Sequence, residues 1–143
     1  MRRPLFAFAV AVVLLVGCGG VPTGPVLPPE YYPDRTTHIS ALRTYFWAYQ
    51  EGDVEVLLTV LGAWEYKDLD DQLKAGEKKA DLAAWYRQDG ADLTIEDVTW
   101  KHEGKALAYV QVVLRAAGKR YEKTYSMLRR PDGWVVSGKR ALR

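Results

Sequence analysis

The chain has 143 residues, with 20 Lys and Arg against 18 Asp and Glu and a single cysteine. This length fits one ordinary domain and a short tail. The near-neutral balance argues against a nucleic-acid-binding protein. The single cysteine excludes an internal disulfide and a site built from several thiolates.

Residues 1–17 are predicted to be a secretory signal peptide. Arg2 and Arg3 supply the positive charge, and an apolar run follows from Leu5 to Val16. This run is shorter than the roughly 20 residues that a membrane-spanning helix needs. It has no polar face, which a buried core helix would carry. We therefore expect the protein to be exported, which argues further against a nucleic-acid partner.

The end of this segment, Leu15-Val16-Gly17-Cys18, resembles the lipobox of bacterial lipoproteins. The resemblance implies a diacylglycerol thioether on Cys18, often with a third acyl chain, and so attachment to a membrane. Two or more acyl chains hold a protein stably at a bilayer. Gly19 stands where some lipoproteins carry a retention aspartate. The expected location is the cell envelope, at the periplasmic face of the outer membrane if the cell has two membranes.

Residues 18–35 carry most of the prolines and several glycines of the chain. This composition excludes a helix or a central strand and predicts an extended linker. At about 3 Å per residue the linker would reach on the order of 40 Å. The folded domain is expected over residues 36–143.

Helices are predicted first in this domain. Thr36 or Thr37 can cap a helix whose apolar residues recur at three- and four-residue steps up to Gly52. Asp53 can cap a second helix that stops at Gly62. The next segment is less regular, with one or two turns over 68–75 and a better helix over 77–88. Residues 64–66 are expected to lie in a loop between helices.

The pattern then changes to a period of two. Four strands are predicted over 93–102, 105–116, 119–130 and 134–141, separated by short turns. Gaps this short join antiparallel neighbours. The predicted fold class is therefore α+β, with N-terminal helices packed on one face of a curved four-stranded antiparallel sheet.

The elements that follow Thr36 resemble the nuclear transport factor 2-like, or SnoaL-like, superfamily, and its lipoprotein members in particular. The resemblance rests on these segments: Tyr45-Phe46, Glu51-Gly52-Asp53, Leu57-Leu58, Ala108-Tyr109-Val110-Gln111-Val112, Tyr125-Ser126-Met127-Leu128 and Asp132-Gly133-Trp134-Val135-Val136. It implies a cone of helices and sheet whose open end is often a pocket.

Some enzymes of that superfamily use an acid deep in the cone, helped by tyrosine. The residues here that could do so are Asp97, Tyr109 and Tyr125, although a solvated Asp97 and tyrosines in the core are the simpler interpretation. His38 and His102 both look exposed, and neither has a metal partner at ligand spacing. No buried pair of His and Asp can be placed, so no catalytic residue, metal or cofactor is assigned.

Aromatic residues offer a second kind of site. Trp47, Trp64, Tyr66 and Trp85 are candidates to line a pocket for an apolar or aromatic ligand, with packing over a small core as the alternative. Whether such a pocket exists depends on the space between the helices and the sheet. This space is either open or filled by Phe46, Leu57, Trp85 and Tyr125.

Charge is unevenly distributed along the chain. Residues 18–100 hold 7 basic and 15 acidic residues, whereas residues 101–143 hold 11 basic and 3 acidic. Two explanations of this uneven distribution are open. Acidic helices and basic strands attract each other within the domain, or a basic sheet surface meets an anionic membrane or partner.

The expected function is a non-catalytic, lipid-anchored envelope domain that binds a small apolar ligand or a protein partner. The first alternative is a small isomerase or dehydratase that uses the cone pocket. The second is a structural lipoprotein that forms a homodimer through its sheet.

Overall fold

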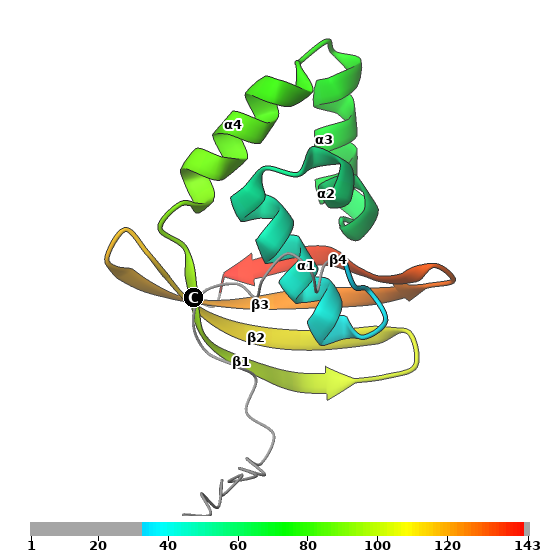
Figure 1. Ribbon diagram of the computed structural model, residues 1–143. Coiled ribbons are helices and arrows are strands. Elements are labelled where there is room, and N and C mark those ends of the chain that lie inside the picture. The colour runs from blue at the N-terminus through cyan, green and yellow to red at the C-terminus, as the bar shows by residue number, and fades with distance from the viewer. Residues whose placement is uncertain (1–32, 142–143) are drawn as a thin grey trace, which may run out of the picture.

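The computed structural model describes residues 33–141, with the side chains of residues 102 and 139–141 left aside. Four helices come first and four strands follow (Figure 1). The helices are α1 (His38–Glu51), α2 (Val54–Val60), α3 (Ala63–Lys74) and α4 (Lys79–Gly90), and the strands are β1 (Thr94–Glu103), β2 (Leu107–Ala116), β3 (Lys119–Arg130) and β4 (Gly133–Ala141).

The predicted signal peptide and the lipidation residue Cys18 lie outside the described residues, as does the linker up to residue 32. Export and lipid attachment therefore stay predictions. Among residues 33–141, no helix is long and apolar enough to cross a membrane.

The chain enters the domain slightly earlier than the sequence suggested, at Asp34 and Arg35. The Arg35 guanidinium lies 2.7 Å from the Asp132 carboxylate in the β3–β4 turn and also donates to the Thr59 carbonyl. The hydrogen bond from Arg35 lowers the pKa of the Asp132 carboxyl. The Trp134 backbone N–H donates to the Arg35 carbonyl at 2.9 Å. These contacts fix the start of the domain against its last hairpin.

Helix α1 begins and ends as its sequence predicts. The Thr37 side chain accepts from the Ser40 backbone N–H, and the Ser40 hydroxyl accepts in return from the Thr37 N–H, which makes a capping box. At the other end Gly52 adopts the left-handed conformation, with φ of 67°. A Cβ there would lie 2.3 Å from the Ala83 carbonyl oxygen. Gly52 therefore lets α1 approach α4 closely.

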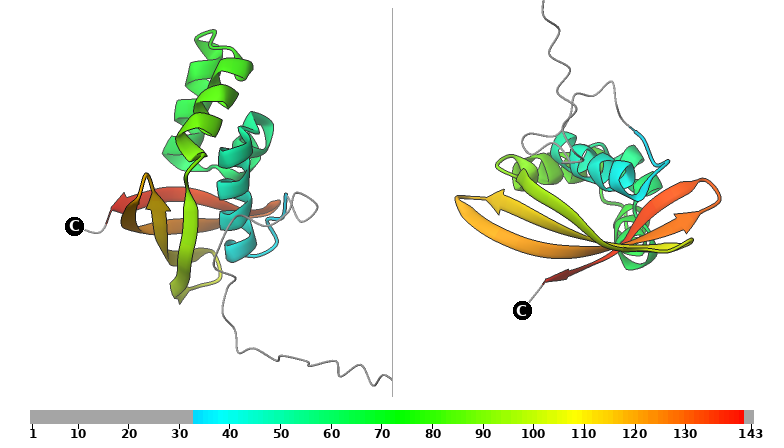
Figure 2. Two further views of the ribbon diagram at one scale, coloured as in Figure 1. Left: turned by 60° about the vertical axis from the view of Figure 1, so that its left-hand side comes forward. Right: turned by 90° about the horizontal axis from the view of Figure 1, so that it is seen from below.

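Helices α3 and α4 form a hairpin that projects from the sheet, and we call it the helical arm (Figures 1 and 2). The predicted loop over residues 64–66 is wrong, because these residues belong to α3, which begins at Ala63. Ion pairs between Lys67 and Asp71 and between Lys74 and Asp70, each one turn apart, lie along this helix. The arm turns at Gly76, where φ is 97° and a Cβ would meet open space.

The sheet confirms the predicted strands and their order. Its strands are antiparallel neighbours in the order β1-β2-β3-β4. The β2–β3 turn has positive φ at both Ala117 and Gly118, as a two-residue hairpin turn requires. Figure 2 shows the curvature of the sheet and the helices gathered over one face. The α+β class is thus confirmed.

Side chains fill most of the space between α1 and the sheet, where a hollow of about 100 Å³ borders Phe46, Leu114 and Tyr125. Ala108, Val110, Val112 and Leu114 share the covered face of β2, and all four are buried. Of the four residues expected to decide the question, Phe46, Leu57 and Tyr125 are buried in this core, and Tyr125 packs edge-on to Phe46 with ring centroids 5.5 Å apart. Trp85 is 54% exposed and lies elsewhere. A pocket must therefore be sought outside the helix–sheet layer.

Two basic residues of the sheet pair with acids of the sheet itself. Arg115 and Arg120 both lie within ion-pair distance of Glu96, and Arg120 also pairs with Glu122 at 3.0 Å. The attraction expected between acidic helices and basic strands stays a prediction.

Candidate functional site

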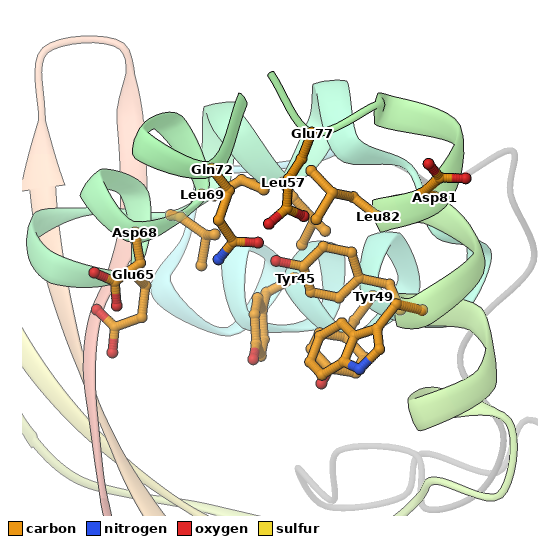
Figure 3. A pocket seen from close by; sticks show the side chains of 13 residues that line it. Tyr45, Tyr49, Leu57, Glu65, Asp68, Leu69, Gln72, Glu77, Asp81 and Leu82 are labelled. Carbon is orange, nitrogen blue, oxygen red and sulfur yellow. The ribbon is translucent and has the colours of Figure 1, made fainter. Parts of the chain in front are cut away.

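A cleft of about 500 Å³ opens among the four helices, beside the core rather than inside it. Helix α1 forms its base, and the two helices of the arm form its sides (Figure 3). Its lining comprises Tyr45, Tyr49, Leu57, Leu61, Glu65, Asp68, Leu69, Gln72, Glu77, Asp81, Leu82, Trp85 and Tyr86. This volume lies within the range of small-molecule sites, roughly 300–1,000 Å³.

Helical periodicity brings these residues together. On α3, Glu65, Asp68, Leu69 and Gln72 are spaced by three or four residues and so share one face. Leu69 is the one residue of α3 that is fully buried, and the others surround it. The face of α3 that buries Leu69 is therefore also the face that carries polar groups into the cleft.

Aromatic rings form one side of the cleft. Tyr86 stands edge-on to Tyr49 at 4.9 Å and to Trp85 at 5.0 Å between ring centroids. Tyr45 lies below, with its ring 5.8 Å from that of Tyr49. The Tyr49 hydroxyl donates to the Asp89 carboxylate. The rings hold one another in place, so the surface they offer a ligand is preformed.

Burial changes the chemistry of these tyrosines. It raises the pKa of Tyr45 well above the ordinary value, and the neighbouring tyrosines and Glu65 raise it further. The pKa values of Tyr49 and Tyr86 are also raised, chiefly by burial. The three hydroxyls therefore stay protonated at neutral pH, and they offer the cleft neutral hydroxyl groups.

Four carboxylates line the cleft. Figure 3 shows Glu65 and Asp68 side by side at one end, and Glu77 turned toward the space between α3 and α4. The Oε2 atom of Glu65 is buried and has no hydrogen-bond partner within residues 33–141. No Lys, Arg or His belongs to the lining. In the same part of the chain, no three acidic, His or Cys residues are grouped so as to hold a metal ion.

The predicted ligand-binding aromatics are not brought together. Trp85 lines the cleft, whereas Trp64 is 75% exposed and, with Tyr66, lies on α3 outside the lining. Trp47 lines a separate groove near Gly52 and Asp53. Sequence reasoning missed the tyrosines of α1 and the acids of α3, and recognising α3 as a helix would have placed the acids on one face.

The three residues considered for catalysis also lie apart. Tyr125 is buried under α1, and Tyr109 lies on the opposite face of the sheet and is partly exposed. Asp97 is exposed on the edge strand β1, where its carboxylate accepts from the Val98 backbone N–H at 2.9 Å. None of the three lines the cleft.

His38 is buried, whereas the sequence predicted that it would be exposed. Its side chain is 9% exposed and lies edge-on to Trp134 with ring centroids 5.5 Å apart. Its Nδ1 lies 3.5 Å from the Glu103 carboxylate. The expectation failed because the last strand, distant in sequence, brings Trp134 over the first turn of α1. The side chain of His102 lies outside the part of the chain that the structure describes.

No family model matches the chain, and no curated protein matches it. Among solved structures, the chain is similar to a SEC-C motif containing protein from Rhodopseudomonas palustris, with 14% identity over 73% of this chain and 77% of that chain and a TM-score of 0.47.

The resemblance to nuclear transport factor 2-like lipoproteins is therefore corrected. No model of such a family matches the chain. All four helices precede the sheet, and the sheet is open, with β1 and β4 at its two edges. The segments that carried the resemblance, such as a turn before Trp134, are those that any helix-covered meander uses.

Proposed function

We propose that this protein is a non-catalytic binding domain that holds a small, largely apolar ligand in the cleft between α1 and the helical arm. The observation that carries the proposal is the cleft itself. It has a preformed aromatic side, buried leucines at its base and a few polar groups at its edges, which is the usual make-up of a small-molecule site.

The arm supports the proposal because it contributes few buried residues to the core. Of the residues in α3 and α4, only Leu69, Leu82 and Gly90 are buried, so the arm adds little to the hydrophobic core. Its inner face instead encloses the cleft. The proposed setting is the cell envelope, which the predicted signal peptide over residues 1–17 favours.

Two small aromatic probes of the same shape test the proposal: 2-phenylethanol and 2-phenylethylamine. Each would be titrated into the isotope-labelled full chain while backbone amide NMR signals are recorded. At least one probe should shift the signals of α1, α3 and α4 and leave those of β2 and β3 unchanged. Shifts spread over the sheet, or no shifts with either probe, would contradict the proposal.

A pair of variants makes the test specific. Gln72→Trp places a large ring in the cleft and should abolish binding, because Gln72 lies on its lining. Lys74→Trp adds the same ring to an exposed position of the same helix, outside the lining, and should bind as the parent does. Equal binding by the two variants would exclude the cleft as the site.

A further inference from the structure

We infer that the cleft selects ligands that combine an aromatic or apolar body with a positively charged nitrogen, as in a primary or quaternary organic ammonium ion. This inference rests on the proposed function and adds the chemical class of the ligand. It follows from the charge of the lining, the state of Glu65 and the adjacent aromatic rings.

The lining is acidic without compensation from its own residues. Four carboxylates and no basic side chain face or border the cleft. Three lysines of the arm pair with other acids: Lys67 with Asp71, Lys74 with Asp70, and Lys79 with Glu55 of α2. Lys67 also interacts electrostatically with Asp68, so Asp68 is partly balanced. Glu65 and Glu77 form no ion pair within residues 33–141, and an anionic ligand would meet repulsion there.

Glu65 is the acid best placed to meet a charged group. Its Oε2 atom is buried and lacks a hydrogen-bond partner in the described part of the chain. The negative charge of Glu65 helps to raise the pKa of the Tyr45 hydroxyl, which lies at the base of the cleft. A buried carboxylate oxygen without a partner is unfavourable unless a donor or cation reaches it. A ligand ammonium group at this end of the cleft would supply both a donor and a positive charge.

The aromatic side suits the rest of such a ligand. An ammonium group is attracted to the face of Trp or Tyr within about 6 Å of the ring centroid, and attached apolar groups pack against the same surface. Trp85, Tyr86 and Tyr49 offer these surfaces on the same lining. Tyr45 lies between Tyr49 and Glu65 (Figure 3). A bare metal ion does not fit as well, because the described residues form no group of three suitable ligands.

The experiment compares three probes of similar shape and different charge: 2-phenylethylamine, protonated at pH 7, neutral 2-phenylethanol and anionic phenylacetate. Dissociation constants for the full chain would be measured by NMR titration. We expect the ammonium compound to bind about tenfold more tightly than the alcohol, and phenylacetate to bind most weakly. Added salt should weaken only the binding of the ammonium compound.

Variants locate the effect. Glu65→Gln keeps the shape of the side chain and should remove most of the preference for the ammonium compound while leaving alcohol binding within about twofold. Glu51→Gln is the control, since Glu51 is exposed and outside the lining. Asp68→Asn is the second variant if Glu65→Gln lowers the melting temperature, because Asp68 is exposed and its change leaves the core intact.

The outcomes separate this inference from the proposed function. Equal binding of ammonium and alcohol in the cleft, or an unchanged preference in both Glu65→Gln and Asp68→Asn, would overturn the inference and leave the binding function standing. Tighter binding of phenylacetate would also overturn it. Failure of all three probes to reach the cleft would overturn both.

Discussion

The helix–sheet layer, which consists of α1 and the sheet, and the helical arm differ in how many of their side chains are buried. In the layer, α1 covers the sheet with side chains such as Leu42, Phe46 and Tyr125 that water barely reaches. In the arm, α3 has Leu69 as its only buried residue and α4 only Leu82 and Gly90, and large rings such as Trp64 and Trp85 are exposed. The difference indicates that stability resides in the layer, while the cleft depends on how the arm is held.

The largest expected effect tests this division with one residue type. Trp134 is buried against the first turn of α1, so Trp134→Ala should cost about 3–5 kcal/mol of unfolding free energy. Trp64→Ala in the arm should change it by no more than about 0.5 kcal/mol. Urea denaturation followed by circular dichroism would measure both. Similar losses for the two variants would show that the arm carries as much stability as the layer.

The next effect concerns the joint between the two regions. Gly52→Ala introduces both left-handed strain and an overlap with the Ala83 carbonyl, and it should cost about 2–4 kcal/mol. Gly118 also has a positive φ but faces open space, so Gly118→Ala should cost about 1 kcal/mol from strain alone. Thermal denaturation of the two variants gives the difference. If Gly118→Ala is the more damaging change, the close approach of α1 and α4 is not what Gly52 provides.

Alkaline pH should weaken the layer. Burial raises the pKa of Tyr125, so the folded state keeps this hydroxyl protonated where the unfolded chain would release the proton. Its contribution to stability is complete below the ordinary pKa of 10.0 and is lost as pH rises above it. Unfolding free energy should then fall by about 1.4 kcal/mol per pH unit for each such tyrosine. Denaturant titrations from pH 8 to pH 12 (about two units on each side of that pKa) should show a smaller slope for Tyr125→Phe; an equal slope would contradict its burial.

The smallest effect sharpens the comparison at one helix end. Thr37→Ala removes the capping box of α1 and should cost about 1 kcal/mol. Helix α3 begins without a side-chain cap at Gly62, so it has no equivalent to lose. Thr37→Ser is the matched control, because it keeps the accepting hydroxyl and should stay near the parent in a thermal melt. A similar loss for Thr37→Ser would point to the methyl group instead of the cap.

The sequence predicted the layer well because its signals are local and repeated. The capping residues Thr37 and Asp53, the stop at Gly52 and the Ala117-Gly118 turn each act within a few residues of themselves. Alternation along β2 then indicated which side chains face the helices. Together these features predicted the class and the order of elements.

The arm and its cleft were harder to predict for a physical reason. Helix α3 is polar around most of its surface, so it lacks the apolar period by which amphipathic helices are recognised. Its ion pairs one turn apart were the signal available. The cleft also combines residues of four helices, and no local pattern shows which faces will meet. The expected cone placed the pocket between α1 and the sheet, where the hollow is only about 100 Å³.

The tip of the arm has a consequence for engineering the protein. Gly76 is exposed, its backbone is left-handed and nothing lies within 4 Å of where its Cβ would be. Insertions at exposed loop tips are well tolerated, and lengthening such a loop twofold costs only about 0.6 kcal/mol. Extra residues placed there would hang beside the mouth of the cleft without reaching the sheet. The protein thus offers a position where a sensor module or a selective cover can be grafted while the folding unit is left as it is.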